Sequence, residues 1–112
     1  MRSQRTYQAL GVYMALSAVV EALEPGFIAR TRETVQLPPH VRRLVWPLKA
    51  AAAASLLAVR PCPGVARLGA GTLTGLFVLA VAAHIRVRDL SVAMLAAAVN
   101  AAVFAAVSVR GP

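Results

Sequence analysis

The chain has 112 residues, which is the length of a single domain. Hydrophobic residues make up 59% of it and charged residues only 14%, whereas a soluble domain carries about 25% charged residues. A soluble chain of this size buries only about two-thirds of its surface, so a soluble monomer is close to excluded. Disorder is excluded because it requires low hydrophobicity.

The net charge of +8 raises the question of nucleic-acid binding. A nucleic-acid-binding domain gathers its basic residues on one face. Here the arginines lie between apolar stretches or at their ends, which is typical of membrane proteins. We therefore expect the lipid bilayer, and no nucleic acid, as a partner. The single Cys62 matches no disulfide, metal or redox spacing, and we expect no metal site.

Four apolar stretches follow one another along the chain, each close to the about 20 residues that cross a bilayer. Only helices fit, because lipid offers backbone groups no hydrogen-bond partners. The sequence therefore predicts an all-α fold, an integral membrane four-helix bundle, with residues 1–112 as a single membrane domain. The expected spans are residues 7–24, 41–59, 65–85 and 90–109.

The first span follows Arg2 and Arg5, an arrangement that resembles a signal peptide. Three further spans follow and no clear cleavage site does, so we expect an uncleaved helix. The connection over residues 25–40 alternates apolar and charged residues between proline-containing ends. A short amphipathic helix at the membrane interface and an ordinary polar loop both fit this segment.

The second span is marginal because it contains Lys49. A lysine near the centre of a span costs about 2.5–3.5 kcal/mol on insertion, and each large apolar residue returns about 0.3–0.6 kcal/mol. We expect this helix to insert only with partners, so that Lys49 faces protein. Tight turns at residues 60–64 and 86–89 join the later spans. In the third span, Gly71 and Gly75 have the spacing of close helix packing.

The orientation of the chain in the membrane is weakly specified, with five arginines expected on one side and six on the other. An even number of spans places both termini on the same side. Arg2 and Arg5 favour the cytoplasm for that side. Tyr7 and Trp46 are expected to act as anchors at the membrane interface.

Ionisable residues inside membrane spans are costly and point to function. Tyr13, Ser17, Glu21 and Glu24 follow one another at helical spacing and share a face of the first helix. Since consecutive spans are antiparallel, residues from all four spans reach the same half of the bilayer. The sequence predicts one water-accessible cavity between the four helices, open to one side of the membrane and lined by Glu21, Lys49, His84 and Asn100.

Each candidate role has a structural alternative. Glu21 and His84 are the expected catalytic acid–base pair if the protein is an enzyme, with Lys49, Asn100, Glu24 and Tyr13 as ligand-binding residues. Alternatively, Glu21 and Lys49 form an ion pair that only fixes helix packing. Glu24 and His84 would then mark the membrane surface, and Asn100 would join two helices by a hydrogen bond.

Several motifs resemble the DoxX-like family of small four-helix bacterial membrane proteins. They are Glu24-Pro-Gly-Phe-Ile28, Leu37-Pro-Pro39, Pro47-Leu-Lys49 and Ala82-Ala-His-Ile-Arg-Val-Arg-Asp89. The resemblance implies a multi-pass bundle in the bacterial cytoplasmic membrane. Some relatives are similar to a subunit of a thiosulfate–quinone oxidoreductase, and others are linked to membrane redox assemblies. The family often has a Gly and a Lys near the end of the first helix, where this chain has Val20-Glu21-Ala22.

Three functions fit these observations, and no cofactor signature separates them. The first is an accessory subunit of a membrane redox or biosynthetic system that binds a quinone or another small lipophile. The second is an intramembrane acid–base enzyme, such as an isomerase. The third is a small proton-coupled exporter, which shares only generic features with the small multidrug resistance transporters. A homo-oligomer and a larger membrane complex are both open.

Overall fold

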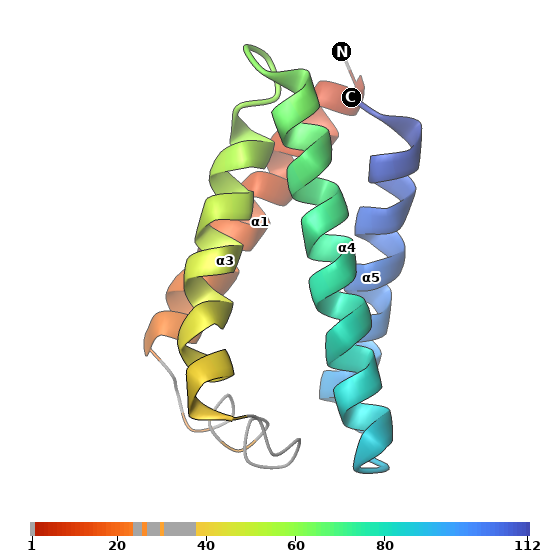
Figure 1. The fold of residues 1–112 in the computed structure, drawn as a ribbon. Coiled ribbons are helices and arrows are strands. Elements are labelled where there is room, and N and C mark those ends of the chain that lie inside the picture. The colour runs from red at the N-terminus through yellow and green to blue at the C-terminus, as the bar shows by residue number, and fades with distance from the viewer. Residues whose placement is uncertain (1, 24–25, 27–29, 31–37) are drawn as a thin grey trace.

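The computed structural model describes residues 2–23, 26, 30 and 38–112. This part of the chain is all-helical and contains no strand, which confirms the predicted fold class (Figure 1). Both alternatives for the connection at 25–40 fall mainly outside the described residues, as does Glu24. The helices are α1 (Arg2–Leu23), α3 (Pro39–Leu57), α4 (Pro63–Arg86) and α5 (Val92–Arg110).

Three of these helices are long and apolar enough to cross a membrane, over Gln4–Leu23, Pro63–Arg86 and Val92–Arg110. The remaining helix, α3, has 19 residues and carries two arginines and Lys49. It therefore has the length of a span without the apolar composition. Three of the four expected spans are therefore matched by composition, and the insertion of α3 only in contact with other helices stays a prediction.

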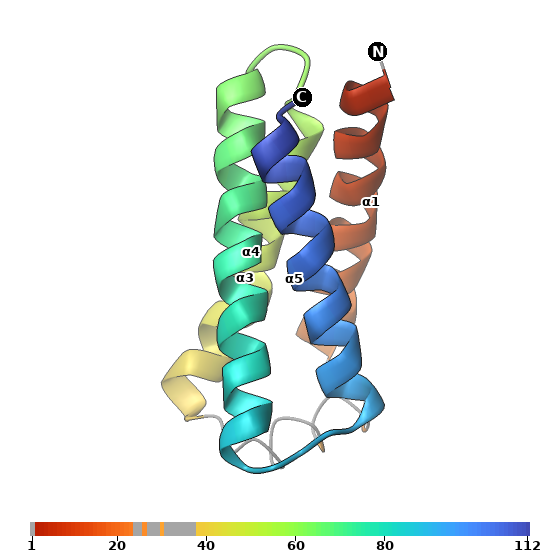
Figure 2. The ribbon, with the colours of Figure 1, turned by 90° about the vertical axis from the view of Figure 1, so that its right-hand side faces the viewer.

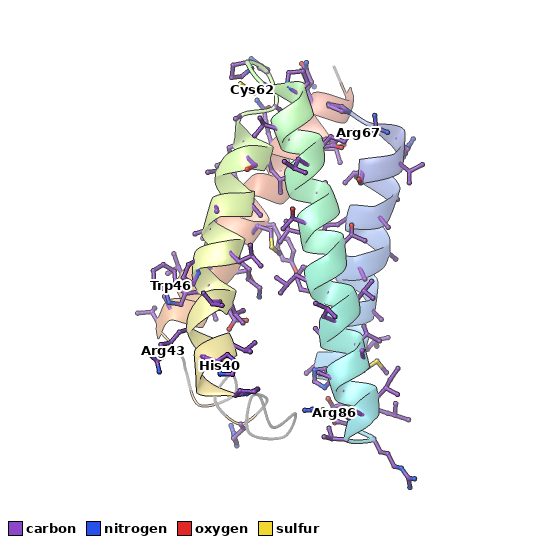
Figure 3. All side chains as sticks on the ribbon, in the orientation of Figure 1. His40, Arg43, Trp46, Cys62, Arg67 and Arg86 are labelled. Atoms are coloured by element: carbon purple, nitrogen blue, oxygen red, sulfur yellow. The ribbon has the colours of Figure 1, made fainter. Side chains whose placement is uncertain are left out.

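The helices form two pairs, α1 with α3 and α4 with α5, and α3 packs against α4. Both termini lie at the same end of the bundle, beside the turn that joins α3 to α4 (Figures 1 and 2). From that turn α3 and α4 diverge toward the opposite end (Figure 1). Charged side chains mark both ends, with Arg67 near the termini and Arg43 and Arg86 at the far end (Figure 3).

Local sequence explains where the helices begin and end. Both α3 and α4 begin with a proline, a residue favoured at the first helical position because its missing N–H would be unpaired there anyway. At the other terminus, Gly111 follows α5 with φ 74, the left-handed conformation that glycine adopts without strain. The turn between α4 and α5 contains Arg88, whose φ of 58 is also left-handed.

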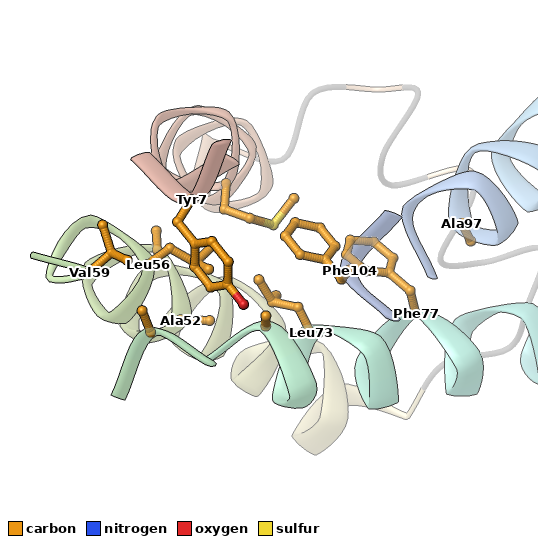
Figure 4. Packing of buried hydrophobic residues seen from close by; sticks show 12 residues of the cluster. Tyr7, Ala52, Leu56, Val59, Leu73, Phe77, Ala97 and Phe104 are labelled. Atoms are coloured by element: carbon orange, nitrogen blue, oxygen red, sulfur yellow. The ribbon is translucent and has the colours of Figure 1, made fainter. Parts of the chain in front are cut away.

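The half of the bundle near the termini has a packed core (Figure 4). Tyr7 is 1% exposed in this core, and its hydroxyl donates a hydrogen bond to the backbone oxygen of Val107 at 2.6 Å. The prediction of Tyr7 as an interfacial anchor is therefore wrong, because its polar tip finds a carbonyl near the end of α5. The fully buried large side chains are Tyr7, Met14, Leu56, Val59, Leu73 and Phe104.

Close helix approach depends on Gly11 and Gly69. A Cβ atom added at Gly69 would lie 2.8 Å from the Ser55 Cβ, and one at Gly11 would lie 2.8 Å from the Leu57 Cγ. The expectation of close packing is wrong for Gly75, where an added Cβ would meet nothing within 4 Å. At Gly71, which is also exposed, an added Cβ would lie 3.6 Å from the Ser108 Oγ of α5, an ordinary contact distance.

Candidate functional site

The other half of the bundle contains a partly open cavity of about 870 Å³, within the range of about 300–1,000 Å³ that is common for small-molecule sites. All four described helices contribute to its wall, which is mostly apolar. The lining residues are Tyr13, Leu16, Ser17, Val20 and Glu21 of α1, Val41, Val45 and Lys49 of α3, Leu76, Phe77, Leu79, Ala80, Ala83 and His84 of α4, and Val92, Ala93, Ala96, Ala97 and Asn100 of α5.

An ion pair between α1 and α3 lies in this wall. The Lys49 Nζ donates hydrogen bonds to the Glu21 Oε1 at 2.8 Å and to the Ser17 Oγ at 3.2 Å. Ser17 and Glu21 are one helical turn apart, so both face the same approaching side chain. Lys49 is 7% exposed. Its charge is thus removed from lipid and compensated, as intramembrane charges require.

A layer of aromatic rings separates the cavity from the packed core. The Lys49 Nζ lies 5.5 Å from the centroid of the Phe77 ring, within cation–π range. The Phe77 ring stacks on that of Phe104, with centroids 5.9 Å apart and planes 4° apart. Phe77 belongs both to the cavity wall and to the core cluster. It therefore forms the floor of the cavity, with Lys49 beside it.

His84 lines the cavity from the last turn of α4 and is held by the following turn. Its Nδ1 lies 2.7 Å from the Asp89 Oδ2, and the Ser91 hydroxyl donates to the same oxygen at 3.0 Å. The hydrogen bond with His84, assisted by that of Ser91, holds the pKa of Asp89 below its usual range. An ionised Asp89 only accepts hydrogen bonds, so Nδ1 of His84 must carry the proton.

This arrangement leaves the second ring nitrogen of His84 for other chemistry. The Nε2 atom has no hydrogen-bond partner among the described residues. In the neutral ring with Nδ1 protonated, Nε2 accepts a hydrogen bond, and in the charged ring it donates one. His84 is 5% exposed and lines the cavity, so its Nε2 can form a hydrogen bond with a molecule bound there.

Asn100 and Tyr13 lie in the same wall, on α5 and α1. The Asn100 side-chain amide donates to the Ala96 oxygen of its own helix at 2.8 Å. Within the described ranges, Asn100 makes no hydrogen bond to another helix. The alternative in which Asn100 joins two helices is therefore not what the structure shows there. Its side-chain oxygen stays available to a ligand.

The structure thus brings together five of the six predicted site residues: Tyr13, Glu21, Lys49, His84 and Asn100 all line one cavity. The sixth, Glu24, lies outside the described residues. The sequence did not predict Asp89 as the partner of His84, nor Phe77 as the floor of the cavity. A usable signal for Phe77 exists, because it precedes His84 by seven residues and so shares its face of α4.

The polar groups of the cavity are suited to hydrogen bonding. Among the described residues, no three His, Cys, Asp or Glu side chains are grouped closely enough to hold a metal ion. What the wall presents is an ion pair, a carboxylate-held histidine, an amide and a phenol, spaced along apolar side chains.

The chain belongs to the DoxX-like family, whose sequence model matches residues 6–108. The match covers all of α3, α4 and the cavity-lining part of α1, and α5 as far as Ser108. No curated protein and no solved structure matches the chain. The family confirms the resemblance found in the sequence and the membrane character of the helices.

Proposed function

We propose that this member of the DoxX-like family binds a small lipophile with polar substituents, such as a quinone, in the cavity between its helices. It would do so as an accessory subunit of a redox or biosynthetic system in the bacterial cytoplasmic membrane. The observation that carries the proposal is the cavity itself. Its walls are apolar, and its few hydrogen-bonding groups lie near the floor and near the end of α4.

The walls favour an apolar ligand on energetic grounds. Lipid tails are as apolar as these walls, so a ligand that comes from the bilayer gains from van der Waals packing in the cavity and not from leaving water. Alanines on α4 and α5 leave room for a ring or a chain between the helices. A molecule that already prefers the bilayer loses little by moving into such a site.

The polar groups favour a neutral substituent over a charged one. Lys49 and Glu21 compensate each other, so the floor offers no unpaired charge to a free carboxylate or amine. A carbonyl or hydroxyl oxygen can instead accept a hydrogen bond from Lys49, which has three donors, or bond to Nε2 of His84. Two polar substituents on one ligand would fit groups at two depths.

Native mass spectrometry of the gently solubilised protein tests this function. We expect an added mass that lipid extraction identifies as a lipophile, or a partner chain that holds it. Ala83→Trp should fill the cavity and abolish the added mass. The adjacent Ala82→Trp places the same side chain at an exposed position outside the cavity and should retain it. Equal retention in both variants would contradict the proposal.

Acid–base catalysis on the bound lipophile, such as an isomerisation, is a second candidate. The specific observation in its favour is that His84 is held by Asp89 and lines the same cavity as Glu21. We expect Glu21→Gln and His84→Ala each to change the lipid products of expressing cells while the protein still retains its ligand. Unchanged lipid profiles in both variants would exclude catalysis and leave the binding function standing.

A further inference from the structure

A second hollow lies between α1 and α5, on the outer surface of the bundle. These two helices do not pack along each other as the other neighbouring pairs do (Figure 2). The groove has a volume of about 440 Å³. Its lining residues are Leu10, Tyr13, Val92, Leu95, Ala96, Val99, Asn100 and Val103.

The groove and the cavity adjoin each other. Tyr13 of α1 and Val92, Ala96 and Asn100 of α5 line both of them. These residues therefore stand between the interior of the bundle and its surface. Tyr13 comes from one helix and Asn100 from the other, so the boundary between the two hollows lies where α1 and α5 meet.

The depth of the groove decides what surrounds it. Tyr13 lies midway along the span Gln4–Leu23, and Asn100 lies midway along Val92–Arg110. The middle of a span lies in the hydrocarbon core of the bilayer. Leu95 and Val99 in the groove are 60% and 55% exposed. The groove therefore faces acyl chains and is remote from water.

Two polar groups stand where the groove meets the cavity. In the part of the chain that the structure describes, neither the Tyr13 hydroxyl nor the Asn100 side-chain oxygen has a hydrogen-bond partner. Polar groups without partners are costly in hydrocarbon. A lipophile with a hydroxyl or carbonyl group would supply the missing partner as it passes.

We propose that the α1–α5 groove is a lateral entrance through which the ligand moves from the bilayer into the cavity. Tyr13 and Asn100 lie at the inner end of this entrance and form hydrogen bonds with the polar substituent of the ligand there. The proposal rests on the proposed binding function and adds the ligand's source. The ligand is dissolved in the membrane and does not arrive from water.

Reversible closure of the groove tests the entrance. Leu10→Cys and Val103→Cys, in a Cys62→Ser background, place thiols on the two helices at positions that line the groove but not the cavity. A bifunctional methanethiosulfonate reagent would join them, and a reducing agent would release them. The probe is a small aryl diazirine dissolved in phosphatidylcholine vesicles that hold the protein, with photolabelled residues located by mass spectrometry.

We expect the open protein to be labelled at cavity residues such as Ala83, the joined protein to lose this labelling, and reduction to restore it. Val12, which is 52% exposed and lines neither hollow, should be labelled throughout. Labelling of the cavity in the joined protein would overturn the entrance and leave the binding function intact. Absence of cavity labelling in the open protein would overturn both.

A bulky side chain in the groove gives an independent test that needs no reagent. Val99→Trp should slow labelling of the cavity, whereas Val109→Trp, outside the groove on the same helix, should not. The role of Tyr13 and Asn100 is tested with a diazirine that bears a hydroxyl group. Tyr13→Phe combined with Asn100→Leu should reduce labelling by the hydroxylated probe relative to the plain probe. An unchanged ratio would remove these two residues from the proposal.

Discussion

The two halves of the bundle are built from the same four helices and use small residues in opposite ways. Near the termini, Gly69 and Gly11 let helices approach until Ser55 and Leu57 fill the space. In the other half, alanines of α4 and α5 line a cavity, and α3 and α4 diverge there (Figure 1). Small residues close a bundle only where the backbones come together.

Polar groups also have different roles in the two halves. In the packed half they close the structure: Tyr7 bonds to Val107, and the Arg67 guanidinium donates to the backbone oxygens of Ser108 and Val109 at 2.7 and 3.1 Å. In the half that contains the cavity, called the hollow half below, polar groups keep donors or acceptors that can form hydrogen bonds with a molecule in the cavity. We therefore expect the stability of the bundle to depend most on the packed half and the proposed ligand binding to depend on the other half, and substitutions in each half can test this division.

The largest effect is expected at the ion pair between Lys49 and Glu21. Lys49→Leu alone should remove the ammonium group that lies 2.8 Å from the largely buried Glu21 carboxylate, and breaking one side of a buried pair costs about 3–5 kcal/mol. Lys49→Leu together with Glu21→Leu should recover much of that loss, because two apolar side chains replace two charges. Unfolding of detergent-solubilised protein measures the free energies. Additive losses would show that the pair does not stabilise the hollow half.

The second-largest loss of stability is expected in the packed half, from the addition of a single methyl group. Gly69→Ala would place a Cβ 2.8 Å from that of Ser55 and 3.3 Å from the Ala52 oxygen, and such overpacking costs about 1–3 kcal/mol. Gly75→Ala on the same helix meets nothing within 4 Å and should gain about 0.5–1 kcal/mol from helix propensity. Equal effects at the two glycines would show that α3 and α4 are not in close contact.

A smaller effect should separate two tyrosines of α1. Tyr7→Phe removes a buried hydrogen bond, and this typically costs about 0.5–1.5 kcal/mol. The Val107 oxygen keeps a second donor, the backbone N–H of Gly111 at 2.9 Å, so the loss should stay in that range. Tyr13→Phe removes a hydroxyl with no partner among the described residues and should not lower the free energy of unfolding. A loss at Tyr13 would contradict the division into two halves.

The sequence predicted the elements of this structure better than their contacts. Span lengths and proline positions were enough to place four helices, and the antiparallel order was enough to bring Glu21 and Lys49 to one depth. The rotation of each helix about its own axis was harder to predict from the sequence. That rotation buries Tyr7 and Gly69 and leaves Gly75 facing outward. A uniformly apolar helix has no polar face from which its rotation could be predicted. Asp89 was missed because it meets His84 only after the chain leaves α4.

The smallest effect is a pH dependence confined to the hollow half. The pKa of Asp89 is lowered in the folded protein, first by its hydrogen bond with His84. An unfolded Asp titrates near pH 3.9, so between the two pKa values the unfolded state binds more protons than the folded one. The contribution of Asp89 is therefore complete above the unfolded pKa and is lost as the pH falls through the folded pKa.

Acid should thus loosen the end of α4 before it affects the packed half. Hydrogen exchange measured above pH 4 and again below the lowered pKa of Asp89, each corrected for the intrinsic exchange rate at that pH, should show reduced protection at residues 84–89, with no comparable change around Leu73. Asp89→Asn should remove most of this difference, because the amide keeps the shape of the side chain and does not titrate in this range. If exchange accelerates equally in both halves, or if Asp89→Asn behaves like the unmodified protein, the His84–Asp89 pair does not hold the end of α4.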